Sequence, residues 1–398
     1  MSKRLQKQAR KQAPPRAGKT TGQTTQTLAA QSRAPQSRAR RNDRPSATLK
    51  DVAERAGVST ATVSRVLNAQ GKVNRETEAR VTEAVAALGY VPHAAARALA
   101  SRRSRTIGAV TAALDNPIFA RGIQALEHRL EQSGYGLLVA SSNYEPAREL
   151  KQVRTMVERG IDAIMLQGDS HLPEVYALLQ RKGIAYINTW VYDARAPHPC
   201  CGFNNELAGR HLADYLLELG HRDIAMVAGI TAGNDRARNR IKGVRAALKA
   251  RGLDLPPERI VERPYSVSDG RDGLRALLSS PGPRPTAVIG GNDLLAIGVM
   301  LEAQQSGLSV PGDLSVAGFD DIELAANLSP ALTTIHVPVE EICTLAGDYL
   351  VARVEGRPAR DHVDLEARLV VRQSTGRPSI RPGARTGGRT GGRAPRRG

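Results

Sequence analysis

Apolar positions between residues 48 and 88 recur every three or four residues, the spacing of amphipathic helices. The pattern predicts three short helices, at 48–57, 60–68 and 75–88. Thr48 and Ser59 stand where N-caps are expected. Packed together, the apolar faces would close a small core made of Leu49, Val52, Ala53, Ala56, Val63, Val66, Leu67, Val81, Ala84, Val85 and Leu88.

From residue 106 onward, short apolar runs alternate with amphipathic stretches. The runs predict strands at 107–112, 136–140, 163–166, 185–188, 201–203, 224–228, 259–263, 287–289 and 314–317. The stretches predict helices at 119–132, 145–159, 172–181, 206–219, 236–251, 269–278 and 294–305. An extended segment at 333–338, a helix at 339–355 and a strand at 364–371 follow. This alternation indicates parallel sheets covered by helices on both faces, and its restart after Asn204 indicates two similar doubly wound α/β subdomains.

Charge is divided unevenly along the chain, whose formal net charge is +18. Residues 1–46 hold twelve basic residues and one acid, and residues 376–398 hold seven arginines and no acid. These two basic tails are almost free of large apolar residues, so we expect them to be disordered. Residues 47–105 carry +5 and residues 106–375 carry −5. Residues 47–105 are therefore expected to face a polyanion, and residues 106–375 are not.

The composition also argues against several classes of protein. We find no apolar run near the roughly 18–20 residues of a membrane span, and no secretory signal in the first 46 residues. Three cysteines are too few and too oddly spaced for a disulfide framework or a zinc site. Phosphate-binding loops and hydrolase motifs are missing. We therefore expect a cytoplasmic protein that is not an enzyme, with no metal, no cofactor and no membrane partner.

The first two predicted helices, joined by a turn containing Gly57, have the form of a helix-turn-helix, in which the second helix enters the major groove of DNA. Its outward face holds Thr60, Ala61, Thr62, Ser64 and Arg65. Small and hydroxyl side chains allow close approach to the bases, and an arginine can bind guanine through two hydrogen bonds. A generic three-helix bundle with a solvated face is the alternative.

The sequence from Thr48 to Asn68 closely resembles the DNA-binding headpiece of the LacI/GalR family of bacterial transcription regulators. It reads Thr-Leu-Lys-Asp-Val-Ala-Glu-Arg-Ala-Gly-Val-Ser-Thr-Ala-Thr-Val-Ser-Arg-Val-Leu-Asn. Residues 89–100 are similar to the stretch that joins that headpiece to the hinge helix. More loosely, the resemblance continues to about Thr375 and leaves only the tails uncovered.

The resemblance implies specific roles in DNA binding. Thr60, Ala61 and Arg65 match the base-reading positions, and Leu99 matches a leucine that two protomers wedge into the minor groove. His93 departs from the asparagine common at its position. The expected DNA-binding set is Thr48, Ser59, Thr60, Ala61, Thr62, Ser64, Arg65, Asn68, His93, Ala96 and Leu99.

The expected organisation follows from these patterns. A disordered tail (1–46) precedes a helix-turn-helix domain (47–92), a hinge helix with its linker (93–105), a periplasmic-binding-protein-like core for effector binding and dimerisation (106–375), and a Gly/Arg tail (376–398). Within the core, one subdomain takes about 106–203 plus 337–356, and the other takes about 204–336 plus 357–375.

Ligands of doubly wound folds bind outside the carboxyl ends of the strands, which here means a cleft between the subdomains. Aromatic rings can stack on a sugar, and Asp and Asn accept hydrogen bonds from hydroxyls. The resemblance implies that Arg240 grips the effector. Read singly, Phe119 and Trp190 could be core residues, and Asp293 and Asp320 could be helix N-caps. The expected effector-binding set is Asn116, Ile118, Phe119, Trp190, Asn204, Arg240, Asn292, Asp293 and Asp320.

We therefore expect a sequence-specific transcription regulator, most simply a repressor, that binds a near-palindromic double-stranded DNA operator as a homodimer. A small molecule in the cleft would control DNA binding. Sugars, sugar acids and polyols suit the residues, as do nucleobases, and inducer or co-repressor action stays open. The alternative function is a solute-binding receptor module without a DNA function.

Overall fold

The structure is a computed structural model that describes residues 47–67, 73–91 and 103–379. The chain divides after Val91 into two units, a small helical one and a large α/β one. The expected tail at 1–46 and the residues Asn68, His93, Ala96 and Leu99 lie outside the described residues.

The helical unit contains α1 (Leu49–Ala56), α2 (Thr60–Leu67) and α3 (Arg75–Leu88), as the apolar spacing predicted. At the start of α1, Thr48 and Asp51 form a reciprocal capping box: the Asp51 amide donates to the Thr48 hydroxyl, and the Thr48 amide donates to the Asp51 carboxylate. Six small or β-branched side chains form the buried core, namely Val52, Ala53, Ala56, Val63, Val81 and Ala84. Val66 and Leu67 pack against it but are only half-buried.

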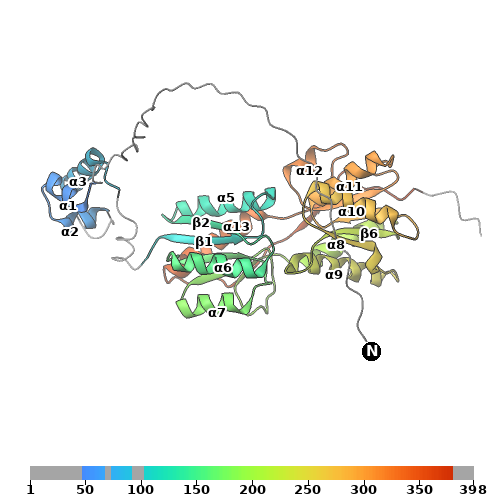
Figure 1. Ribbon diagram of the computed structural model, residues 1–398, viewed down its shortest axis with the longest axis horizontal. Helices are drawn as coiled ribbons and strands as arrows, with labels where there is room; N and C mark the ends of the chain where they lie inside the picture. The colour runs from blue at the N-terminus through green and yellow to red at the C-terminus, as the bar shows by residue number, and fades with distance from the viewer. Residues whose placement is uncertain (1–46, 68–72, 92–102, 380–398) are drawn as a thin grey trace, which may run out of the picture. The chain divides into compact units, whose positions relative to one another are not determined.

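The first lobe of the α/β unit is a parallel sheet in the order β11-β5-β4-β3-β1-β2. Its strands are β1 (Thr106–Thr111), β2 (Gly136–Ser141), β3 (Ala163–Gln167), β4 (Ala185–Thr189), β5 (Cys200–Gly202) and β11 (His362–Asp364). Helices α5 (Pro117–Glu131) and α13 (Val339–Val354) cover one face, and α6 (Pro146–Glu158) and α7 (Pro173–Lys182) cover the other (Figure 1). In β3, Ala163 and Met165 belong to one hydrophobic cluster and Ile164 and Leu166 to a second, so both faces of this strand are apolar.

The second lobe repeats this design in the order β12-β10-β9-β8-β6-β7, with only β12 antiparallel to its neighbour. Its strands are β6 (Ile224–Gly229), β7 (Ile260–Arg263), β8 (Ala287–Gly290), β9 (Ser315–Asp320), β10 (Thr333–His336) and β12 (Arg368–Val370). Helices α8 (Asn205–Glu218) and α9 (Asp235–Ala250) cover one face, and α10 (Val267–Ser279) and α11 (Asp293–Gln305) cover the other (Figure 1). Two short helices complete it, η1 (Pro257–Arg259) and α12 (Glu323–Asn327).

The last crossing between the lobes differs from the expectation. A single strand at 364–371 was predicted, but the segment forms β11 in the first sheet and β12 in the second. The chain therefore returns to the second lobe at 365–367, later than the expected boundary near residue 357. Short edge strands are defined by their pairing partners, which lie far away in sequence, and so local spacing cannot separate them.

The C-terminal tail also begins later than expected. Residues 376–379 were assigned to a disordered tail, but the Gly376 carbonyl accepts hydrogen bonds from Nε2 of His221 (2.8 Å) and from the Ser315 hydroxyl (3.1 Å). These contacts hold the segment against the second lobe. Residues 380–398 lie outside the described residues. Among the described helices, none combines the length and apolar character needed to span a membrane.

Helices α8 and α9 approach each other through two glycines. A Cβ on Gly243 would overlap the Glu206 carbonyl oxygen, and a Cβ on Gly209 would lie 2.5 Å from the Arg240 carbonyl oxygen. Backbone atoms cannot rotate away as a flexible side chain can. Glycine at these two positions therefore sets the distance between the helices, and with it the position of Arg240.

We expect Gly243→Ala to lower the melting temperature of the full chain. Alanine improves helix propensity by up to about 1 kcal/mol, but forcing the helices apart costs about 1–3 kcal/mol. Circular dichroism melts can measure the difference. As a control, Lys249→Ala on the exposed side of α9 should leave the transition unchanged; an unchanged melt for Gly243→Ala would contradict the packing argument.

Candidate functional site

A small pocket lies where the carboxyl ends of the strands in the two lobes face each other. Residues from both lobes are needed to build it. The first lobe supplies Asn116, Phe119, Tyr144 and Trp190, and the second supplies Arg236, Arg240, Tyr265, Asn292 and Asp320.

Six of the nine residues expected at an effector site line this pocket: Asn116, Phe119, Trp190, Arg240, Asn292 and Asp320. The other three lie elsewhere. Ile118 is fully buried in the core, and Asn204 caps α8 by accepting from the Leu207 amide at 3.0 Å. Asp293 is buried behind the pocket, where its carboxylate accepts from the Ile322 amide and the Thr334 hydroxyl. It therefore fixes the ends of β9 and β10.

Three lining residues were not predicted from the sequence: Tyr144, Arg236 and Tyr265. A signal existed for Arg236, because it precedes Arg240 by four residues on one helix and so shares its face. The two tyrosines lie in loops, where no periodic pattern indicates a direction. Their rings lie 5.4 Å apart across the pocket, one from each lobe.

The Arg240 guanidinium is buried and held on several sides. Its Nε donates to Oδ1 of Asn205 at 3.1 Å, and its Nη1 donates to the Gly291 carbonyl at 2.7 Å. The guanidinium carbon lies 3.6 Å from the centre of the Phe319 ring, a cation–π contact. Its Nη2 lies 3.7 Å from Oδ1 of Asp320, too far for a hydrogen bond. The arginine is thus oriented with one edge toward the pocket.

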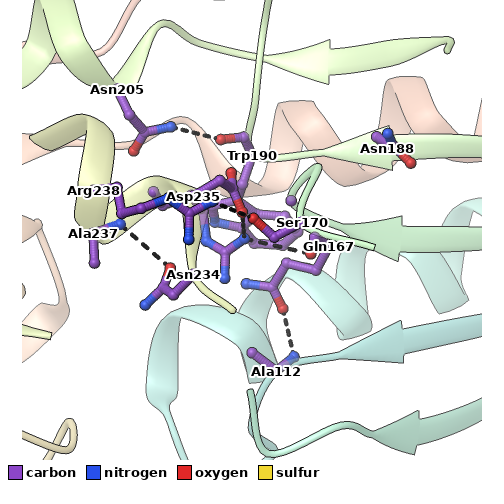
Figure 2. Close-up of polar contacts among 12 residues, drawn as sticks. Ala112, Gln167, Ser170, Asn188, Trp190, Asn205, Asn234, Asp235, Ala237 and Arg238 are labelled. Carbon is purple, nitrogen blue, oxygen red and sulfur yellow. Dashed lines mark hydrogen bonds and ion pairs between the residues drawn. The ribbon is translucent and has the colours of Figure 1, made fainter. Parts of the chain in front are cut away.

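Arg236 is also buried, and it has its own carboxylate. Its Nη1 lies 3.1 Å from Oδ1 of Asp235 and 3.4 Å from the Gln167 carbonyl of the first lobe. The Gln167 amide is oriented by its neighbours, because its Oε1 accepts from the Ala112 amide at 2.7 Å (Figure 2) and also from the Thr111 hydroxyl at 2.7 Å. One wall of the pocket is therefore held by contacts that join the two lobes.

Trp190 ends β4 with a positive φ of 62°, a conformation that costs free energy in a residue other than glycine. Asn205 from the second lobe holds it by donating to its carbonyl at 2.8 Å (Figure 2). The ring meets Phe119 edge to face, with centroids 5.6 Å apart. Its Nε1 is buried and has no hydrogen-bond partner among the described residues, which leaves an unsatisfied donor on a residue that lines the pocket.

Asp320 ends β9, and its φ of 116° is also unfavourable for a side chain. Burial raises the pKa of this carboxyl to about 6, although the charges of Arg240 and Arg236 act to lower it. At neutral pH the carboxylate is ionised and available as an acceptor. Backbone strain and a raised pKa at one pocket residue are typical of a binding site rather than of a stabilising core.

In the helical unit, Thr60, Ala61 and Arg65 are exposed on α2, and Thr62 and Ser64 are half-buried. Ser59 starts the helix, and its hydroxyl accepts from the Thr62 amide at 3.2 Å. Thr48 is likewise occupied in the capping box of α1. The outward face of α2 therefore carries the small and basic side chains that the motif predicted.

Comparison with known proteins identifies the family. Residues 48–93 match the bacterial regulatory proteins of the lacI family, and residues 213–375 match the periplasmic binding protein-like domain. The ribose operon repressor of Escherichia coli (strain K12) is 35% identical over 309 residues, covering 77% of this chain and 93% of that protein. The chain belongs to the LacI family.

Other LacI-family proteins extend the match. The HTH-type transcriptional repressor PurR of Photorhabdus laumondii is 33% identical over 332 residues, covering 82% of this chain and 96% of that protein. The structure of the lac repressor dimer bound to operator and the anti-inducer ONPF matches with a TM-score of 0.73 and 29% identity, covering 83% of this chain and 99% of that one. The predicted fold and family are confirmed, and the chain is a DNA-binding transcription regulator under small-molecule control.

We expect Asp320→Asn to stabilise this LacI-family chain at pH 7.5 and to lose that advantage as the pH falls. The folded-state pKa of about 6 exceeds the ordinary value of 3.8, so the folded protein binds more protons than the unfolded one between these values. Stability from this group therefore falls as pH rises toward 6, and asparagine removes the cost. The gap between the two melting temperatures should be smaller at pH 5 than at pH 7.5; a gap of equal size at both pH values would contradict the raised pKa.

Proposed function

We propose that the chain is a repressor that binds a near-palindromic operator as a homodimer in the cytoplasm and changes its affinity for DNA when a small neutral sugar occupies the interlobe pocket. It acts by binding rather than by catalysis. The single observation that carries the ligand class is the balance of charge and hydrogen-bonding groups around the pocket.

Each pocket arginine already has a carboxylate beside it. Arg236 pairs with Asp235, and Arg240 lies next to Asp320. A buried pair that is internally neutral gains little from a further charge, whereas removing a ligand's charge from water is costly. This balance favours a neutral ligand over a sugar acid.

The remaining groups suit hydroxyls. Trp190 Nε1 can donate, the Asp320 carboxylate can accept, and an OH group can satisfy either one. The aromatic rings of Phe119 and Trp190 meet edge to face and so do not form a parallel slot for a flat base. These features support a monosaccharide, and the similarity to a ribose operon repressor makes D-ribose the first probe.

Calorimetric titration of the full chain with D-ribose, other neutral monosaccharides, their aldonic acids and adenine can test the ligand class. We expect a neutral sugar to bind and the matching acid to bind at least about tenfold more weakly, a difference of about 1.4 kcal/mol. Trp190→Phe, which keeps a ring but removes the N–H, should weaken binding.

Asn74→Ala is the matched control, because Asn74 caps α3 in the helical unit just as Asn292 caps α11, and of the two only Asn292 lines the pocket. Asn292→Ala should weaken sugar binding, and Asn74→Ala should not. Tighter binding of the acid than of the sugar would overturn the neutral-ligand proposal, and binding of adenine alone would replace it with a nucleobase.

For the DNA side, we expect Arg65→Ala to reduce the preference for an operator, selected from random duplexes by the full chain, over unrelated DNA. A base contact of this kind contributes about 1–3 kcal/mol of discrimination. Arg80→Ala, which removes the same charge from the exposed surface of α3, is the control. Equal losses on operator and unrelated DNA would remove Arg65 from base reading.

A further inference from the structure

Outside the pocket, a second set of contacts joins the two lobes. Arg238, midway between Arg236 and Arg240 in α9, donates from Nη2 to the Ser170 hydroxyl at 2.6 Å. Ser170 lies in the loop between β3 and α7 of the first lobe. Figure 2 shows Asp235 and Arg238 of the second lobe beside Ser170 and Gln167 of the first. Neither Arg238 nor Ser170 lines the effector pocket.

Arg238 is anchored within its own lobe before it reaches across. Its Nη1 donates to the Thr231 carbonyl at 2.8 Å. Thr231 is held in turn by Glu262 on β7, whose carboxylate accepts from the Thr231 amide (2.8 Å) and hydroxyl (2.9 Å). The guanidinium is therefore pre-oriented toward Ser170, so little side-chain entropy is lost when that hydrogen bond forms.

The loop that carries Ser170 lies flush against the start of α9. Gly168 has φ +91°, and a Cβ there would overlap the Arg236 guanidinium and crowd the Asp235 carboxylate. Only glycine allows this approach. The Gln167 carbonyl next to it accepts from Arg236 at 3.4 Å. The clasp, as we name it, consists of the Arg238–Ser170 hydrogen bond and the close contact at Gly168.

We propose that the clasp sets the affinity for the effector without touching it. The inference rests on the proposed function only in that the effector occupies the interlobe pocket. Because that pocket is built from both lobes, it is complete only when they are close together. A contact that exists only in this arrangement raises its population, and effector affinity rises by the same factor. Arg238 is thus a positioning residue.

Two opposite variants test the clasp in the full chain. Arg238→Ala removes the hydrogen bond, and Gly168→Ala inserts a methyl group that wedges the loop away from α9. We expect both to weaken binding of the neutral sugar, by about fivefold for Arg238→Ala given the partly exposed hydrogen bond. For Arg238→Ala the loss should appear in the dissociation rate, since this variant leaves the pocket-lining groups unchanged, whereas Gly168→Ala also crowds Arg236, which lines the pocket. Ser170→Ala combined with Arg238→Ala should cost no more than either alone.

Hydrogen exchange without any ligand provides the second measurement. Peptides spanning 167–171 and 230–238 should exchange faster in both clasp variants than in the natural chain. Arg259→Ala is the matched control, because the side chain of this half-buried arginine donates to the Pro283 carbonyl within its own lobe. It should change neither exchange nor affinity.

The outcomes separate the two proposals. If Arg238→Ala had the same hydrogen-exchange rates as the unsubstituted chain, the clasp would not hold the two lobes together. Faster exchange with unchanged sugar affinity would show that it does not set affinity. If no sugar binds even the natural chain, the proposed effector class fails, and the exchange data still decide whether the clasp exists.

Discussion

A guanidinium can be buried only if most of its N–H groups find acceptors, and α9 buries two of them one turn apart. The acceptors cannot all come from α9 itself. Arg240 takes them from Asn205 and from the Gly291 carbonyl, while Arg236 uses Asp235 and the Gln167 carbonyl of the other lobe. The start of α8, the loop before α11 and the end of β3 must therefore all converge on one face of α9.

This requirement explains several features that look unrelated in the sequence. Glycines at 209 and 243 bring α8 close enough for Asn205 to reach Arg240. The same Asn205 holds the Trp190 carbonyl, and so links the arginine of one lobe to the aromatic ring of the other. Strained backbone at Trp190 and Asp320 persists because these neighbours fix it. The pocket is preorganised by polar contacts rather than by apolar packing.

Much of the fold could be predicted from local pattern, because the sheets are parallel and apolar on both faces, as the two faces of β3 show. The set of residues that line the pocket was only partly predictable. Positions directly after strands identified Trp190 and Asp320, but the same rule also selected Asn204 and Asp293, whose polar atoms cap a helix or tie strands together. Asn116 and Asn292 also cap helices and yet line the pocket, so only the neighbours in space decide whether a capping residue also faces the ligand.

The sequence by itself determined the helix-turn-helix, the family and the doubly wound architecture, because capping residues, apolar spacing and the motif from Thr48 to Asn68 act over neighbouring residues in the chain. Tertiary structure alone decided where β11 and β12 pair, that Tyr144 and Tyr265 face each other, and that Arg238 reaches Ser170. Each of these depends on residues that are far apart in the chain and come together only when both lobes have formed. Single residues supply the chemical groups of the pocket, but these groups come together only when the two lobes are close.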